Sequence, residues 1–374
     1  MTTRHLKNQW LLIFPALLML CACAPATAIP DESIPNTLHQ APTELIENKV
    51  TDILEQMTLE EKIGQMTLVE RQCVKKGDIQ KHFIGAIFSG GGSSPSPNEP
   101  QAWADMIAQF QDEALSTRLA IPILYGIDSI HGNGALYGAT IFPHEIGLGA
   151  THDSNLVYQI GQVTAVEMAA IGIRWNFSPV VAVPQDIRWG RTYEAYSEDT
   201  ALTAELGAAY IKGLQSLPAS YQKAEAQSIF VLATPKHYLG DGGTTFGSST
   251  FRYGNASPDQ IYRLDQGDMR LSEEGVRKLF LPPYQSALAA GAKSVMASFS
   301  SWNGTKMHAQ KYLLTDVLKG ELGFDGFIVS DYGGIEQVAA DDYTAVVTSI
   351  NAGIDMSMIP CDYITYIKTV KKAV

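Results

Sequence analysis

Residues 323–338 read GFDGFIVSDYGGIEQV, and this stretch indicates how the chain folds. A continuous apolar run, Phe327-Ile328-Val329, ends at Ser330 and the carboxylate of Asp331, after which come a tyrosine and two glycines. A run that is apolar at successive positions is typical of a parallel strand covered on both faces. Asp331 either caps the next helix or is a reacting group, and this stretch alone supports both interpretations.

Similar short apolar runs recur along the chain, with helical stretches between most of them. Seven or eight such units over about 320 residues predict an α/β fold, a (β/α)8 barrel like that of TIM. A doubly wound sheet is the alternative, but no GxGxxG motif follows the first run. The runs lie at 84–90, 121–128, 172–181, 229–238, 292–300, 326–331 and 352–358, with a weaker candidate at 267–272.

The N-terminal residues differ in composition from the rest of the chain. Basic residues precede the apolar segment 10–20, which is short for a membrane span, so residues 1–22 are predicted to be a signal peptide. Leu20-Cys21-Ala22-Cys23 resembles a bacterial lipobox in which Cys23 is lipidated; the alternative is a signal cleaved after residues 24–28. Residues 23–45 are rich in Pro, Ala and Thr and are predicted to be a linker before a domain at 46–374.

The bulk composition excludes some classes of protein. The net charge of −12 argues against nucleic-acid binding, which needs basic residues to neutralise phosphates. Four cysteines are present, and two of them belong to the predicted leader. The other two, Cys73 and Cys361, are so far apart that we expect them to be unrelated rather than paired. No metal-ligand spacing is present, so no metal site is expected.

Polar side chains gather at the carboxyl ends of the predicted strands, the face of a barrel that carries active sites. The loop at 186–199 adds an arginine fork and a tryptophan, which suit a polar, ring-shaped ligand, although it could instead be a salt-bridged surface loop. Asp128 alone could also be a helix cap, and 241–250 is expected to be a mobile, lid-like loop. Together these groups suit a sugar, and a carboxylate at a strand end is what a retaining glycosidase uses as nucleophile. The strand-end residues are Asp128, His131, Lys236, His237, the segment 301–303 and Asp331.

Five motifs in this order resemble the N-terminal barrel domain of glycoside hydrolase family 3, in its β-glucosidase and exo-1,3/1,4-β-glucanase branch. The resemblance covers about residues 45–374. The motifs are GIDSIHGNG (126–134), SPVVAVPQDIRWGRTYEAYSED (178–199), TPKHYLGDGGT (234–244), VMASFSSWNGTKMHA (295–309) and GFIVSDYGGIEQV (326–338).

The resemblance implies a role for each matching residue. Asp331 would be the nucleophile that forms a glycosyl-enzyme. Tyr332 stands where the family often has a tryptophan that stacks on the next sugar, and Phe299 stands where it often has a tyrosine beside the nucleophile. The residues expected to hold sugar hydroxyls are Asp128, Arg191, Lys236 and His237, with support from Glu194, Trp302 and Asn303.

The resemblance also implies an activity, that of a retaining, exo-acting β-glucosidase or glucan hydrolase. It would need no cofactor and would release glucose from the non-reducing ends of β-glucans or cello-oligosaccharides. The acid/base glutamate of this branch belongs to a second, α/β sandwich domain, which we expect to be missing from a truncated chain. The alternatives are a sugar-binding fragment without turnover and a Schiff-base aldolase that uses Lys236. The expected location is the periplasm of a Gram-negative bacterium or its outer membrane, with contact to the membrane only through a lipid anchor.

Overall fold

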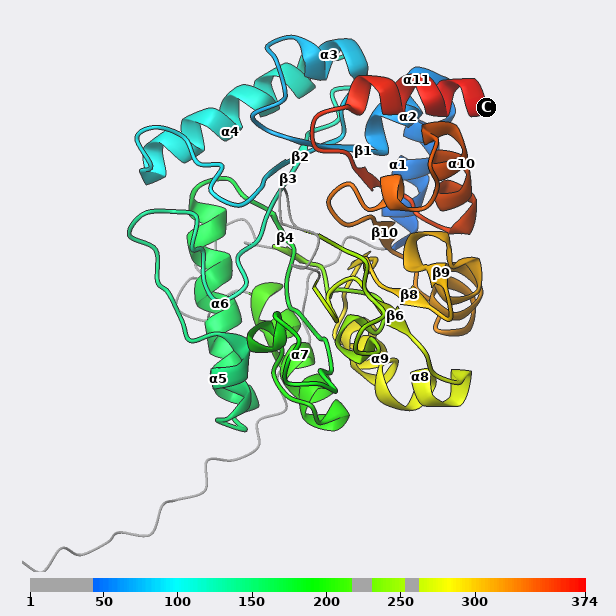
Figure 1. Cartoon of the computed structure of the whole chain (residues 1–374). Helices are drawn as coiled ribbons and strands as arrows, with labels where there is room; N and C mark the ends of the chain where they lie inside the picture. Colours follow the sequence, from blue (N-terminus) through cyan, green and yellow to red (C-terminus); the bar gives the residue numbers. More distant parts are fainter. Residues whose placement is uncertain (1–42, 217–230, 253–261) are drawn as a thin grey trace, which may run out of the picture. The chain divides into compact units, whose positions relative to one another are not determined.

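The computed structural model describes residues 43–216, 231–252 and 262–374 (Figure 1). The predicted signal peptide, Cys23 and nearly all of the predicted linker lie outside the described residues.

Eight parallel strands close into a barrel. Six of them form one sheet in the order β11-β1-β2-β3-β4-β5, and β7 pairs with β10. Two parallel bridges, Tyr238 to Ala297 and Val329 to Met356, join the two sheets at both edges. The predicted (β/α)8 barrel is therefore confirmed. The strands are β1 Thr67–Glu70, β2 Ala86–Ser89, β3 Leu124–Ile127, β4 Trp175–Asn176, β5 Leu232–Ala233, β7 Ser294–Met296, β10 Phe327–Val329 and β11 Ser357–Met358.

Every predicted run contains a strand, but two details differ from the prediction. β1 was not predicted, because its four residues follow the helix Leu59–Gln65 after the single residue Met66 and are too few for a periodic signal. The weaker candidate at 267–272 contains β6 (Asp268–Met269), which lies outside the barrel. There it forms a small sheet with β8 (Ser301–Trp302) and β9 (Thr305–Lys306).

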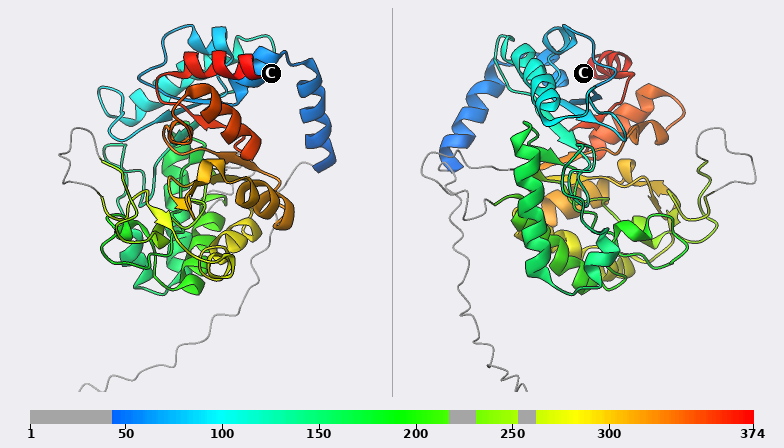
Figure 2. Two further views of the ribbon diagram at one scale, coloured as in Figure 1. Left: turned by 45° about the vertical axis from the view of Figure 1, so that its right-hand side comes forward. Right: turned by 90° about the vertical axis from the view of Figure 1, so that its left-hand side faces the viewer.

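Helices cover the outside of the barrel (Figures 1 and 2). Thr58 and Glu61 form the predicted capping box at the start of α2: the Glu61 amide donates to the Thr58 hydroxyl at 3.3 Å, and the Thr58 amide donates to the Glu61 carboxylate at 2.8 Å. Within the described ranges, no helix has both the length and the apolar character to cross a membrane. The α-helices are α1 Thr43–Gln56, α2 Leu59–Gln65, α3 Asp78–His82, α4 Pro100–Leu115, α5 Glu145–Gly149, α6 Ser154–Ala170, α7 Thr200–Leu214, α8 Glu273–Leu279, α9 Pro282–Ala289, α10 Asp342–Ala352 and α11 Tyr363–Ala373, and a π-helix spans Tyr312–Glu321.

The interior of the barrel is filled by large side chains. Trp175 and Phe177 are fully buried, and their rings meet edge to face at 4.8 Å. Gly126 in β3 makes room for them, since a Cβ there would lie 2.4 Å from the Phe177 ring. The barrel is thus a packed core rather than a pore, which leaves its mouth as the place for a ligand. The inner cluster is Leu68, Ala86, Phe88, Trp175, Phe177, Leu232, Met296, Val329 and Met358.

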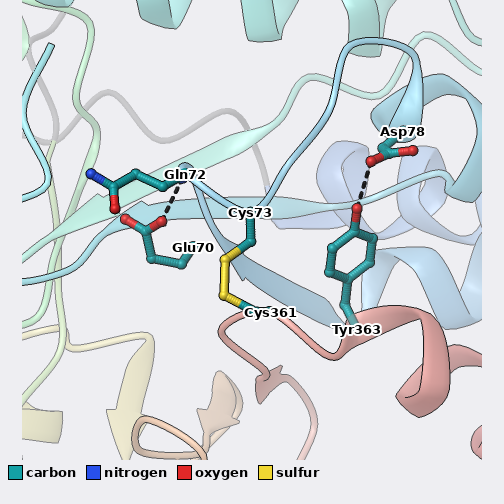
Figure 3. The surroundings of a disulfide bond; sticks show 6 residues. All are labelled: Glu70, Gln72, Cys73, Asp78, Cys361 and Tyr363. Atoms are coloured by element: carbon teal, nitrogen blue, oxygen red, sulfur yellow. Dashed lines mark hydrogen bonds between the residues drawn. A yellow bond between two sulfur atoms is a disulfide. The ribbon is translucent and has the colours of Figure 1, made fainter.

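A disulfide joins Cys73 and Cys361, so the expectation that these cysteines are unrelated is wrong (Figure 3). Their Cα atoms lie 5.2 Å apart although 288 positions separate them in sequence. The reason is the closure of the barrel. The first and last strands are neighbours, with Leu68 opposite Met358, so the loops that follow them meet. The Tyr363 hydroxyl donates to Asp78 at 2.6 Å across the same junction.

Candidate active site

Predicted site residues from four strands meet at the mouth of the barrel. Asp128 follows β3, Arg191 lies in the loop after β4, Lys236 and His237 follow β5, and Asp331 follows β10. Parallel strands in a barrel deliver their carboxyl ends to one face, which is why residues so distant in sequence converge. Three contacts connect the group: the Lys236 ammonium binds the Asp128 carboxylate, Arg191 Nη2 lies 3.3 Å from His237 Nε2, and His237 Nε2 lies 3.6 Å from Asp331 Oδ2.

Asp331 is buried at the end of β10, and its two carboxyl oxygens differ in their partners. Oδ1 accepts the Tyr332 N–H at 2.7 Å, whereas Oδ2 has no hydrogen-bond partner among the described residues. The residue does not cap the following helix, because the N-cap of the 3-10 turn Ile335–Gln337 is Gly334. The cap interpretation is therefore wrong, and the carboxylate is available for chemistry.

The backbone around Asp331 is held by a buried histidine. The Asp331 amide donates to His308 Nε2 at 3.0 Å. A Cβ on Gly334 would lie 2.4 Å from this nitrogen, so the glycine allows the close approach of the imidazole. Burial, with a smaller contribution from Lys306, lowers the pKa of His308 to about 3, so the ring stays neutral and can accept this hydrogen bond.

Burial raises the pKa of the Asp331 carboxyl to about 6, while Arg191, the Tyr332 N–H and Lys236 act in the opposite direction. A carboxyl in this range is ionised at neutral pH and poorly solvated. Both properties favour nucleophilic attack.

Arg191 and Glu194 form a bidentate ion pair beside His237. Arg191 Nε donates to Glu194 Oε1 at 2.9 Å and Nη2 donates to Oε2 at 2.6 Å. Burial alone would raise the pKa of Glu194, but the hydrogen bond and charge of Arg191 lower it overall. The surface-loop alternative describes only the outer part of this loop, where Arg188 pairs with Asp186 in an ion pair close to solvent.

The Lys236 side chain is buried, and its Nζ atom contacts the Asp128 carboxylate. The Asp128 side chain is 45% exposed. No helix begins directly after Asp128, because α5 starts at Glu145, so this residue is not a helix cap either. Lys236 Nζ is engaged in this contact with Asp128, whereas a Schiff-base enzyme requires a lysine nitrogen that is free to attack. This arrangement disfavours the aldolase alternative.

Three predicted residues lie at the edge of this group. Trp302 Nε1 and Asn303 Nδ2 both donate to the Leu271 carbonyl, at 2.9 and 3.0 Å, so their donors hold the β8–β9 hairpin. Tyr332 is half exposed and packs edge to face on Phe88 at 5.9 Å. A binding role for these three side chains stays a prediction.

Two further carboxyl groups, for which no role is predicted, lie near the site. Asp241 Oδ2 lies 2.9 Å from His237 Nδ1, and Asp241 and Gly242 in the turn Asp241–Gly243 are buried, whereas residues 245–247 of the expected lid-like loop are exposed. Glu145 is 1% exposed, and neither of its carboxyl oxygens has a hydrogen-bond partner in another described residue. Burial raises the pKa of Glu145 well above its usual range, and Glu194 adds to the shift while Lys236 opposes it. The sequence gives no signal for Glu145, whereas Asp241 and His308 stood inside quoted motifs.

No described group of three or more His, Cys, Asp or Glu side chains is arranged to hold a metal ion.

A family model and several known proteins are similar to this chain. The family model described as the glycosyl hydrolase family 3 N-terminal domain matches residues 58–374. A periplasmic β-glucosidase of Salmonella typhimurium is 32% identical over an alignment 334 residues long, which covers 85% of this chain and 38% of that protein. The chain thus spans about four tenths of the length of this relative.

Two solved structures resemble the chain over most of its length. One is the exo-1,3/1,4-β-glucanase of a Pseudoalteromonas species, with a TM-score of 0.77 and 38% identity, covering 90% of this chain and 41% of that one. The other is the β-glucosidase of Listeria innocua in complex with isofagomine, with a TM-score of 0.70 and 29% identity, covering 88% and 43% of the two chains.

Proposed function

The chain belongs to glycoside hydrolase family 3, and we propose that the protein is a retaining, exo-acting β-glucosidase or glucan hydrolase. The observation that carries this proposal is Asp331, a buried carboxylate at the barrel mouth whose Oδ2 accepts no hydrogen bond from the described residues. The names of the similar proteins support the substrate class, a β-linked glucoside or oligosaccharide.

In the proposed mechanism, Asp331 Oδ2 attacks the anomeric carbon of the terminal glucose. A covalent bond forms between this oxygen and the carbon while the bond from the carbon to the leaving oxygen breaks. The leaving oxygen takes a proton from a carboxylic acid, which later removes a proton from the water that releases glucose. Both steps together retain the configuration of the sugar.

The neighbours of Asp331 would bind and orient the sugar. The paired charges of Asp128 and Lys236 offer an acceptor and a donor to vicinal hydroxyls, and Arg191 and His237 line the adjacent side. Tyr332 stands beside the nucleophile with its ring half exposed, which suits stacking on the second sugar.

We assign the proton donor to the α/β sandwich domain that follows the barrel in this branch of the family, since Glu194 is occupied by Arg191. The barrel alone then supplies the nucleophile and the sugar contacts. Sugar binding without turnover is therefore the second candidate for residues 1–374. Isothermal titration with glucose, beside a hydrolysis assay on cellobiose, separates the two, because turnover by these residues alone contradicts the second candidate.

The test of the nucleophile uses a 2-deoxy-2-fluoro-β-glucoside with a dinitrophenolate leaving group, which departs without an acid. Intact mass spectrometry should show one sugar added to the protein and none added to Asp331→Asn. Asp325→Asn, which changes a carboxylate at the opposite end of β10, is the matched control and should label normally. The labelling rate should rise as pH increases through about 6 and then level off, because ionisation creates the nucleophile. Undiminished labelling of Asp331→Asn would remove Asp331 from this role.

We also propose that the protein is exported, with residues 1–22 as signal peptide and Cys23 as a lipid attachment site that leads to a periplasmic or outer-membrane location. The disulfide supports export, because such bonds persist in oxidising compartments. The Salmonella relative is described as periplasmic, which agrees with this proposal.

A further inference from the structure

Asp241 is buried beside His237, in a turn whose backbone is closely packed. The residue follows Gly240, whose φ of +79° turns the chain, and a Cβ on Gly242 would lie 2.9 Å from the backbone of Pro184. The Gly242 carbonyl accepts the Gln185 N–H at 2.8 Å, which fixes the turn from the other side. The position of the carboxylate is thus set by backbone packing rather than by a flexible side chain.

Both oxygens of Asp241 are used as acceptors. Oδ1 accepts the Gly242 N–H at 3.0 Å, and Oδ2 faces His237 Nδ1 at 2.9 Å. Burial raises the pKa of the Asp241 carboxyl to about 7, although Arg191 and the Gly242 N–H lower it, so at a pH well above 7 the group is an acceptor only.

Arg191 shows which nitrogen of His237 carries the proton. A guanidinium can only donate, so the contact of 3.3 Å from Arg191 Nη2 to His237 Nε2 requires a bare Nε2. Burial and the charge of Arg191 lower the pKa of His237 well below its usual range, so the ring is neutral and holds one proton. That proton is on Nδ1 and is donated to Asp241.

The bare Nε2 faces Asp331. It lies 3.6 Å from Oδ2, which is the carboxyl oxygen that lacks a hydrogen bond from the described residues. The opposite tautomer would place an N–H against this oxygen. A hydrogen bond there would stabilise the negative charge before the reaction and weaken the nucleophile.

We propose that Asp241 is a positioning residue that locks the tautomer of His237, so that the ring nitrogen facing Asp331 carries no proton and Oδ2 stays free to attack. This inference rests on the proposed role of Asp331 as nucleophile. The first statement of the inference, that Asp241 fixes the tautomer of His237, can be tested without any substrate.

The decisive variant is Asp241→Asn. The Gly242 N–H would continue to bind the amide oxygen, which turns the amide NH2 toward His237 Nδ1. A donor at this position competes with the Arg191 donor, because a neutral ring can accept at one nitrogen only. The contact at Nδ1 is the shorter one, 2.9 Å against 3.3 Å for Arg191, so we expect the histidine proton to move to Nε2, against Asp331. The substitution keeps the shape of the side chain, and Asp325→Asn serves as the matched control with an exposed carboxylate.

Two measurements test the proposal, both at a pH well above 7. The ¹⁵N shifts of His237 should show a protonated Nδ1 in the wild type and in Asp325→Asn, and a protonated Nε2 in Asp241→Asn. The rate of labelling by the fluoro-sugar should fall about tenfold to a hundredfold in Asp241→Asn alone, the effect of one hydrogen bond to a charged group.

The possible results separate this inference from the proposed function. A protonated Nε2 in the wild type, or an unchanged tautomer in Asp241→Asn, overturns the lock. A switched tautomer with an unchanged labelling rate overturns its link to the nucleophile. Absence of labelling in the wild type would instead count against the proposed function, and the tautomer measurement would still decide whether Asp241 locks His237.

Discussion

Removing the disulfide between Cys73 and Cys361 should destabilise the barrel strongly. We consider the double variant in which both cysteines become serine. Cys361 is exposed and Cys73 is partly exposed, so the change removes little buried surface and its main effect is the loss of the cross-link. The bond closes a loop across 288 positions of sequence, which restricts the unfolded chain far more than a short loop would.

The size of the effect can be estimated from this separation. Loop-closure entropy for about 290 residues corresponds to about 5.6 kcal/mol at 25 °C, and native disulfides deliver about 2 to 5 kcal/mol. The entropy of unfolding of a domain of about 330 residues is about 0.7 kcal/mol per kelvin, so the expected fall in Tm is about 3 to 7 °C. β1 and β11, the strands that close the barrel, are paired at two positions. The disulfide therefore strengthens a junction that has few backbone hydrogen bonds of its own.

Thermal unfolding followed by near-UV circular dichroism measures this effect. The oxidised wild type should melt above the double variant, and a strong reductant should lower the wild type to the level of the variant without changing the variant itself. Because the variant has no disulfide to reduce, a change in its Tm would reveal any side effect of the reductant. Equal Tm values of oxidised wild type and variant, or two free thiols found in the native protein by mass spectrometry, would refute the reasoning.

Two further predictions concern a buried acid and the N-terminus. In Glu145→Gln the stability should depend less on pH than in the wild type. Burial raises the pKa of Glu145 in the folded state, so the folded protein keeps a proton that the unfolded chain releases at its ordinary pKa of about 4.5. The contribution of Glu145 to stability therefore falls as pH rises above that unfolded value. Urea unfolding at about pH 5 and about pH 8 checks this, and an equal pH dependence in both proteins would contradict it. Cys23→Ala should abolish incorporation of labelled palmitate in a bacterial host while Cys21→Ala retains it; incorporation by the first variant would rule out Cys23 as the attachment site.

Much of the fold was predictable because strands buried on both faces leave continuous apolar runs in the sequence. The runs that hold β3 and β10 are of this kind. β1 was missed because a strand of four residues, directly after a helix, carries no periodic signal of its own. The disulfide was missed because distance along the sequence is a poor guide to distance in space when the first and last strands of a barrel are paired.

For the site, the sequence predicted which residues gather but not how they pair. Asp128, Arg191, Lys236, His237 and Asp331 stand at strand ends or in adjoining loops, and strand ends meet in a barrel. Which partner each side chain takes depends on backbone turns within the loops. These turns place Asp241 and His308 beside the predicted residues.

Trp302 and Asn303 differ from the other predicted site residues in the partners of their side-chain donors. Their motif carried them into the predicted site, but the hairpin formed by β8 and β9 points their donors at Leu271. A motif match fixes the position of a residue in the chain, whereas its hydrogen-bond partner depends on the local geometry of the hairpin.

The closure of the barrel has a consequence for how the protein is made. Asp128 and Lys236 can meet once β5 is in place, but Asp331 joins them only when β10 is held between β7 and the bridge to Met356. The Asp128 and Lys236 positions are 108 residues apart in sequence, and contacts of such long sequence separation form slowly. Before β10 has left the ribosome, the nascent chain has Asp128 and Lys236 but lacks Asp331, the proposed nucleophile. Covalent labelling of Asp331 during synthesis would therefore time the completion of the barrel.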